Sequence, residues 1–120
     1  METTTQNDPG KTVAIISYIT IIGFIIAIVM HNDNKNKSEL GAFHIRQALG
    51  IFITGFSLMI VSLIFTNISG LNWIVAILAQ ISYIGLFVFW ILGLIAAVNA
   101  EKKALPLIGD FYQNLLKGIK

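Results

Sequence analysis

The chain has 120 residues, of which 56% are hydrophobic and 12% are charged. Soluble domains are about one-quarter charged, whereas here the 8 basic and 6 acidic residues leave the stretches 12–32 and 47–100 without any charge. This distribution excludes a soluble globular protein, a disordered chain and an ordinary nucleic-acid-binding protein, and it predicts an all-α integral membrane protein.

The chain starts with a polar segment and a first hydrophobic stretch. Residues 1–11 are polar and include a proline, so we expect a flexible N-terminus. Residues 12–30 would form a helix about 28 Å long, close to the hydrocarbon thickness of a bilayer. No cleavage pattern follows, so we interpret this stretch as a retained first span rather than a signal peptide.

The next helix is expected to begin after the polar connection 31–39. Ser38 and Glu39 mark its start, because a serine oxygen can accept a hydrogen bond from a free amide of the first turn. This helix gives the second span, at about 45–66.

The uncharged stretch 47–100 is too long for one helix, which would extend about 80 Å. Turn-forming residues at 66–72 divide it and leave a third span at about 72–98. The sequence leaves open whether this third helix is continuous at Gly85.

Basic residues are unevenly distributed around the three expected spans. The connection 31–46 and the tail 99–120 contain seven of the eight Lys and Arg residues, and only Lys11 precedes the first span. The positive-inside rule then places the connection and the C-terminus in the cytoplasm and the N-terminus outside. The expected location is the inner (cytoplasmic) membrane, with a multi-pass domain over 12–98.

The cytoplasmic tail, 99–120, has an amphipathic pattern of its own. Apolar residues recur at spacings of three and four, which predicts an interfacial helix at the membrane surface. The residues that mark the tail are Leu105, Pro106, Asp110, Phe111 and Lys117. The pattern fits either a docking surface for a partner or an anchor that fixes the C-terminus to the membrane.

A first polar cluster stands at the entrance to the second span. It consists of Phe43, His44, Arg46 and Gln47. Such residues either anchor a helix at the headgroup level or line the cytoplasmic mouth of a cavity between helices.

A second polar cluster lies inside the third span and consists of Gln80, Ser82 and Tyr83. It is interpreted either as part of a polar path through the membrane or as a group that hydrogen-bonds between helices. The stretches 12–30 and 47–98 contain no Asp, Glu, Lys, Arg or His, and the chain has no Cys. We therefore expect no enzymatic activity, no metal site and no cofactor.

Two motifs give the chain a resemblance to a known family. An F-H-x-R-Q motif at 43–47 opens the second span, and L-P-L-I-G-D at 105–110 follows the third. On a small helical membrane protein, this combination resembles the bacterial relatives of the twenty-kilodalton component of the chloroplast inner-envelope import translocon (TIC). The resemblance implies a part in protein import or translocation, although the plastid members have four spans against the three expected here.

These observations lead to three hypotheses about function. The first is a small non-enzymatic inner-membrane protein that assembles with itself or with larger membrane complexes; by the resemblance, the secretion machinery would be a partner. The second is a small-solute transporter or channel subunit, which needs polar groups near mid-membrane. The third is a purely structural scaffold. All three have membrane lipid as a partner and none involves nucleic acid.

Overall fold

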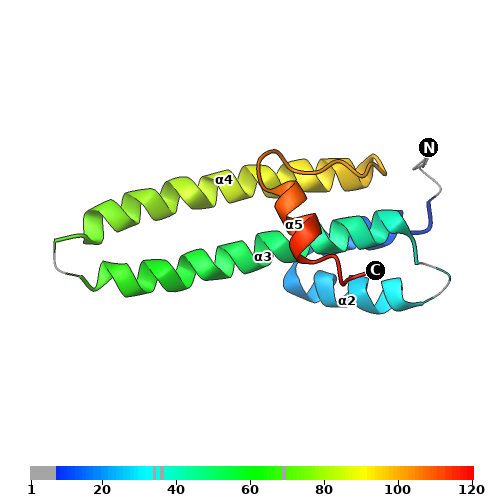
Figure 1. The fold of residues 1–120 in the computed structure, drawn as a ribbon, viewed down its shortest axis with the longest axis horizontal. Coiled ribbons are helices and arrows are strands. Elements are labelled where there is room, and N and C mark those ends of the chain that lie inside the picture. The colour runs from blue at the N-terminus through cyan, green and yellow to red at the C-terminus, as the bar shows by residue number, and fades with distance from the viewer. Residues whose placement is uncertain (1–7, 34, 36, 69) are drawn as a thin grey trace.

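The structure is a computed structural model that describes residues 8–33, 35, 37–68 and 70–120. These residues form five helices and no strand, so the predicted all-α class is confirmed. The helices are α1 (Lys11–Ile19), α2 (Ile21–Asn32), α3 (Glu39–Thr66), α4 (Asn72–Val98) and α5 (Gly109–Leu115). α3 and α4 form a long antiparallel pair, and the three short helices pack around one half of it (Figure 1).

α3 and α4 are long and apolar enough to cross a membrane. They have 28 and 27 residues, so each extends about 40 Å, more than the roughly 30 Å of a bilayer core. Ser38 caps α3, because its Oγ accepts a hydrogen bond from the Gly41 amide at 3.1 Å. α4 runs over the residues expected for the third helix and is continuous through Gly85. Gly70, with φ of +84°, lies in the turn between the two helices.

The expected first span, 12–30, is not a single helix. Thr20 has an extended backbone, with φ of −154° and ψ of 174°, so α1 ends at Ile19 and α2 begins at Ile21. The Thr20 hydroxyl accepts a hydrogen bond from the Gly23 amide at 3.0 Å. Thr stabilises this break because its side chain can replace a helical backbone hydrogen bond at a helix start.

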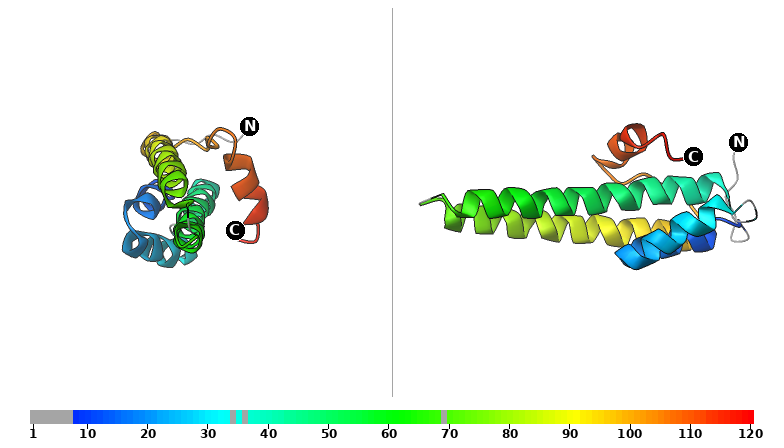
Figure 2. Two further views of the ribbon diagram at one scale, coloured as in Figure 1. Left: turned by 90° about the vertical axis from the view of Figure 1, so that its left-hand side faces the viewer. Right: turned by 90° about the horizontal axis from the view of Figure 1, so that it is seen from below.

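The chain turns back at Thr20, and α1 and α2 form a short helical hairpin beside α3 (Figure 2). Helices of 9 and 12 residues are too short to cross a bilayer. The prediction of three spans is therefore replaced by two helices of spanning length and one half-length hairpin.

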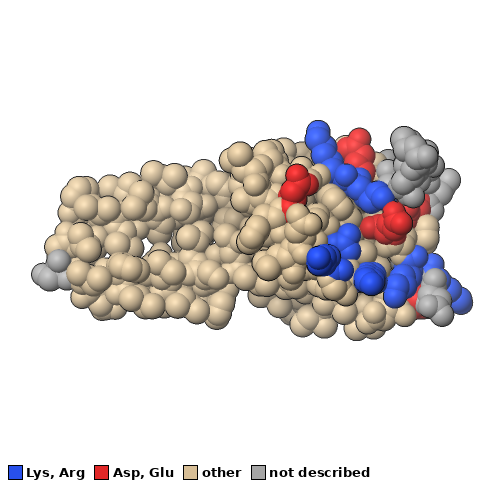
Figure 3. All heavy atoms as spheres, in the orientation of Figure 1, with Lys and Arg blue, Asp and Glu red and all other residues tan. Residues whose placement is uncertain are grey.

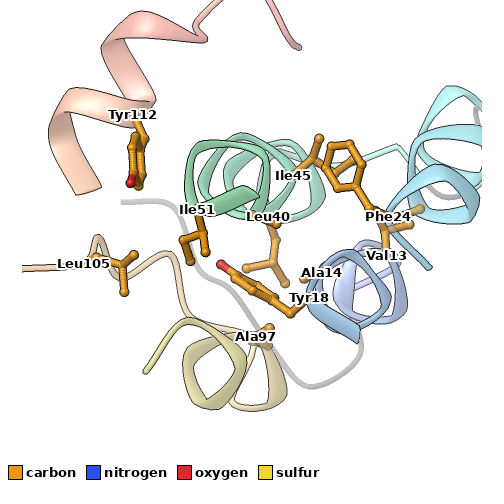
Figure 4. Packing of buried hydrophobic residues seen from close by; sticks show 13 residues of the cluster. Val13, Ala14, Tyr18, Phe24, Leu40, Ile45, Ile51, Ala97, Leu105 and Tyr112 are labelled. Carbon is orange, nitrogen blue, oxygen red and sulfur yellow. The ribbon is translucent and has the colours of Figure 1, made fainter. Parts of the chain in front are cut away.

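The hydrophobic core lies in the half of the molecule that contains the short helices. Tyr18 projects from α1 toward Ile51 on α3 and Ala97 on α4 (Figure 4), and its side chain is fully buried. The close approach of Tyr18 to α4 requires Gly93, since a Cβ added there would stand 2.6 Å from the tyrosine ring. In the other half of the molecule, α3 and α4 are the only described helices; they pack against one another and expose large apolar side chains (Figure 2).

Charged residues of the described chain lie at one end of the fold. α3 beyond Arg46, the whole of α4 and the turn between them contain no charge, and the visible charges in Figure 3 cluster around the short helices. The start of α1 lies at this same end, because Gly10 packs against Ser38 and Gly41 at the start of α3. Residues 8–11 therefore do not lie at the opposite end of the fold from the tail, as three spans would have required.

Candidate functional site

The polar residues at the start of α3 hold the C-terminal segment against the helices. We call His44, Arg46 and Gln47, together with Tyr18 of α1, the tail clamp. His44 and Gln47 are three residues apart, so they share a face of α3, and this face is turned toward Tyr18. Arg46 lies on another face, where it meets α5 and the residues that follow it.

A chain of hydrogen bonds runs through the buried part of the tail clamp. Gln47 Nε2 donates to Tyr18 Oη at 3.0 Å, and Tyr18 Oη contacts His44 Nδ1 at 2.7 Å. His44 Nε2 lies 2.7 Å from the carbonyl oxygen of Glu101. A carbonyl can only accept, so Nε2 carries the proton and Nδ1 accepts from the tyrosine hydroxyl.

The side-chain oxygen of Gln47 extends this series of hydrogen bonds to the tail. Its Oε1 accepts a hydrogen bond from the Leu105 amide at 3.0 Å. The side chains of Tyr18, His44 and Gln47 are fully buried, where unpaired polar atoms would be costly. The tail backbone at Glu101 and Leu105 is thus part of the hydrogen bonding that allows these side chains to be buried.

Arg46 binds the last part of the tail. Its Nε donates to Gln113 Oε1 at 2.6 Å and its Nη1 donates to the Ile119 carbonyl at 2.5 Å. Gln113 in turn donates to the carbonyl of Phe43 at 2.9 Å. These bonds join α3 to both ends of the segment 113–119.

A tight turn directs the tail toward the clamp. Ala100 has φ of +55°, and the Glu101 amide bonds back to the Ala96 carbonyl at 2.9 Å. This is the pattern of a helix that ends in a left-handed residue. The turn brings Glu101 beside His44, although Ala is less suited to this backbone conformation than Gly.

α5 then lies across α3. The Tyr112 ring packs directly on Gly50 and occupies the space that a Cβ at this position would need. The Tyr112 hydroxyl lies 2.5 Å from Thr54 Oγ1. Burial raises the pKa of Tyr112, and the hydrogen bond with Thr54 lowers it by a smaller amount. The tail is therefore docked by a neutral, buried tyrosine as well as by the clamp.

The tail residues singled out in the sequence divide between two environments. Leu105 is buried, whereas Pro106, Asp110, Phe111 and Lys117 are exposed. The helix, at seven residues, is shorter than the apolar pattern of the tail. The outward side of α5 carries Phe111 and Leu115, each about 60% exposed.

The polar residues of α4 do not converge on one site. Gln80 is exposed on the surface of the helix, and Ser82 Oγ donates to the Leu78 carbonyl of its own helix at 2.9 Å. Tyr83 lies in a separate, largely apolar groove with residues of α3 such as Phe56 and Met59. The three side chains therefore line no common cavity.

Three residues of the site carry contacts that the sequence interpretation did not assign. Tyr18 is the centre of the clamp, Trp90 Nε1 donates to the Tyr18 carbonyl at 2.5 Å, and His31 Nε2 donates to the Lys120 carbonyl at 2.9 Å. A Tyr or Trp inside an apolar stretch indicates a buried hydrogen bond, because the polar atom of its side chain needs a partner when buried. The partner of Tyr18 lies 26 residues away and that of Trp90 lies 72 residues away, so the pairing itself could not be predicted from the sequence.

The arrangement binds a segment of the same chain. Among the described residues, no group of three or more His, Cys, Asp or Glu side chains could hold a metal ion. The fold and the clamp together define a small helical membrane protein in which a pair of long helices carries a half-length hairpin and a fastened C-terminal segment.

The chain belongs to the MamF/MmsF magnetosome magnetite crystal formation protein family, whose profile matches residues 10–112. It is also similar to the UPF0132 membrane protein MJ1527 of Methanocaldococcus jannaschii, with 34% identity over 101 residues. That match covers 81% of this chain and 64% of the relative, so the chain spans less than two-thirds of the relative's length. A comparison with solved structures gives no match.

The resemblance to the TIC-related proteins is wrong. The resemblance depended on two motifs, at 43–47 and 105–110, and both lie within residues 10–112, which the MamF/MmsF profile matches. In the structure the first motif holds the segment that contains the second, through Gln47 and Leu105. The two motifs therefore form a contact within the fold, and this contact does not indicate protein import.

Proposed function

We propose that this protein is a non-enzymatic structural component of the cytoplasmic membrane. It favours bilayers that bulge into the cytoplasm, in which the cytoplasmic leaflet is on the convex side. The observation that carries the proposal is the unequal cross-section of the fold. One half contains all five described helices, and the other contains only α3 and α4 (Figures 1 and 2). A protein of this shape displaces more lipid from one leaflet than from the other.

The charge distribution orients the wide half. All eight Lys and Arg residues precede the uncharged part of α3 or follow α4, and basic residues favour the cytoplasmic side. The wide half then occupies the cytoplasmic leaflet, with residues 8–11 and the C-terminus both on the cytoplasmic side. This topology takes the place of the outward N-terminus that three spans required.

The depth of the α1–α2 hairpin supports its insertion into a single leaflet. α2 extends about 18 Å, comparable to half of a bilayer core of about 30 Å. Its outer face is apolar, with Ile21, Ile22 and Val29 each more than 60% exposed. At the tip, Ile21 shares a groove with Phe52 and Phe56 of α3, beyond the last charge at Arg46. This surface suits contact with acyl chains.

The family description connects relatives of this chain with the formation of magnetite crystals in magnetosomes. For this chain we propose the membrane part of such a process: a wedge in the cytoplasmic leaflet supports a membrane that bends around a compartment. Assembly of the protein with itself or with other membrane proteins would increase the local density of wedges. We do not propose a solute pathway, because the polar residues of α4 face different directions.

Sorting between vesicles of different size tests the proposal. The full chain, labelled at an introduced Asn67→Cys, is reconstituted into phosphatidylcholine vesicles, and its density per lipid area is measured against vesicle diameter. Molecules with the charged end outward should become denser as the diameter falls. Molecules with the charged end inward are the internal control and should show the reverse. A density independent of diameter in both orientations would contradict the proposal.

A further inference from the structure

A basic cavity opens beside the start of α3 and shares only Arg46 with the tail clamp. It has a volume of about 690 Å³ and is lined by Lys37, Ser38, Glu39, Ala42, Phe43, Arg46, Lys102 and Lys120. Four of these residues are basic and one is acidic, which gives the lining a net charge of +3. The basic residues come from three segments far apart in the sequence, and the folded tail brings them together.

The acidic member of the lining is already paired. Glu39 Oε1 lies 2.9 Å from Lys102 Nζ, and the Glu39 side chain is 76% exposed. One carboxylate therefore faces four basic side chains, and the lining keeps an excess of positive charge. Arg46 is held in place by Gln113 and Ile119, so its planar donor group is pre-organised, as phosphate recognition favours.

The cavity also has an apolar side, and the charge pattern of α3 indicates its position along the membrane normal. Ala42 and Phe43 line it on the α3 side, and the uncharged part of α3 begins at Gln47, directly after Arg46. Because the hydrocarbon region begins where charge ends, the cavity lies at the level of the lipid headgroups. A ligand with an anionic phosphate and an attached apolar portion fits this combination.

We propose that this cavity binds the phosphate headgroup of an anionic phospholipid of the cytoplasmic leaflet. Basic pockets between membrane helices on the cytoplasmic side are suited to such headgroups. Lys37, Lys102 and Lys120 supply the positive field, and Arg46 supplies directed donors to the phosphate oxygens. The site depends on the charged end meeting a membrane surface and is independent of any preference for curvature.

Binding of short-chain lipids to the full chain in neutral detergent tests the site. The probes are dioctanoyl phosphatidylglycerol, dioctanoyl phosphatidylcholine and inorganic phosphate. The test variant is Lys37→Gln with Lys102→Gln, and the matched control is Lys35→Gln with Lys103→Gln. Both pairs remove two positive charges from the same end of the molecule, but Lys35 and Lys103 do not line the cavity.

Phosphatidylglycerol should bind the unmodified chain more tightly than phosphatidylcholine does. The cavity pair should weaken this binding about tenfold or more, since each basic residue near an anionic lipid contributes substantially to its attraction; the control pair should leave it nearly unchanged. A second cavity pair, Lys37→Gln with Lys120→Gln, should repeat the loss, and unchanged circular dichroism shows that each variant is folded.

An equal loss in the cavity and control pairs would overturn the proposal, because it would indicate general attraction between charges. Inorganic phosphate that binds as tightly as phosphatidylglycerol would overturn the assignment to a lipid. In phosphatidylcholine vesicles the variant with both cavity lysines replaced should depend on vesicle diameter in the same way as the unmodified chain. The lipid-binding assay and the sorting assay therefore test the site and the proposed function separately.

Discussion

Gln47 is the residue on which the inner part of the tail clamp depends. One end of its amide donates to Tyr18 and the other accepts from the Leu105 backbone. Glutamine is able to do both because its side chain carries a donor and an acceptor. A single buried side chain thus joins α1, α3 and the tail. Its loss would leave the Leu105 amide without a partner and would remove one of the two hydrogen bonds of the Tyr18 hydroxyl.

Replacing Gln47 by Leu should release the tail. The unpaired Leu105 amide, together with the lost hydrogen bond to Tyr18, should cost about 1–3 kcal/mol, which favours the undocked tail. Limited trypsin digestion should show faster cleavage after Lys103 and Lys117. The matched control is Gln80→Leu, which makes the same chemical change at an exposed position of α4. Equal cleavage rates in the two variants would argue against the role of Gln47.

Gly93 tests the packing of Tyr18 in the same way. A Cβ at Gly93 would stand 2.6 Å from the Tyr18 ring, whereas nothing lies within 4 Å of one at Gly85. Gly93→Ala should therefore destabilise the protein by about 1–3 kcal/mol through overpacking. Gly85→Ala should be neutral or stabilising by up to about 1 kcal/mol, since Ala favours a helix. Thermal unfolding in detergent, followed by circular dichroism, compares the two; a similar loss in both would contradict the packing described here.

At the scale of elements, α5 is held by contacts rather than by its own helical tendency. Seven residues are too few for a stable isolated helix in water. The helix persists because Tyr112 is buried against α3 and because the clamp fixes the chain on both sides of it. Docking of α5 is therefore sensitive to any change in Tyr112.

Alkaline pH should undock α5. Burial raises the pKa of Tyr112 in the docked state, whereas a released tyrosine ionises near its ordinary value of about 10. The stabilisation is fully present below that ordinary value and is lost as the pH rises through the raised value, because ionisation favours the released form.

A spin label at Gly118→Cys should accordingly become more mobile above about pH 10. In a Tyr112→Phe background the label should lose this pH dependence, since phenylalanine does not ionise. A mobility transition that persists unchanged in Tyr112→Phe would show that another group controls the release.

The sequence was sufficient to predict the elements that depend on residues close together in the chain. The uncharged stretch 47–100 predicted two long apolar helices, and Ser38 with Glu39 indicated where α3 begins. The break at Thr20 was not predictable in this way, because Thr is common within apolar helices and its effect depends on packing against α3 and α4. The same holds for the clamp: residues 43–47 were identified as a cluster, but their partner was a tail segment about 60 residues away.

At the scale of the whole molecule, the fold separates a charged, wide half from an uncharged, narrow one. The molecule extends 54 Å along its longest axis and 24 and 22 Å across. Its short helices, its core and its charges all lie toward one end. This distribution leads to a definite prediction about which segments are accessible from which side of a membrane.

Single cysteines test that topology, since the chain has none of its own. Cysteines at Asp8, Lys35 and Lys117 should all react with an impermeant reagent from the cytoplasmic side, because the half-length hairpin returns the chain to that side. A cysteine at Asn67 should react only from the other side. Labelling of Asp8→Cys from the same side as Asn67→Cys would contradict the hairpin and restore a third span.

The half-length hairpin has a consequence for how the chain enters the membrane. In the proposed topology α1 and α2 return to the side they came from. The only described segment that must then be translocated is the short connection between α3 and α4, and it contains no charged residue. Moving a Lys or Asp across the centre of a bilayer would cost about 2.5–3.5 kcal/mol for each residue. In this topology the described residues insert without that cost, so two apolar helices can enter together as one unit without help from the membrane potential.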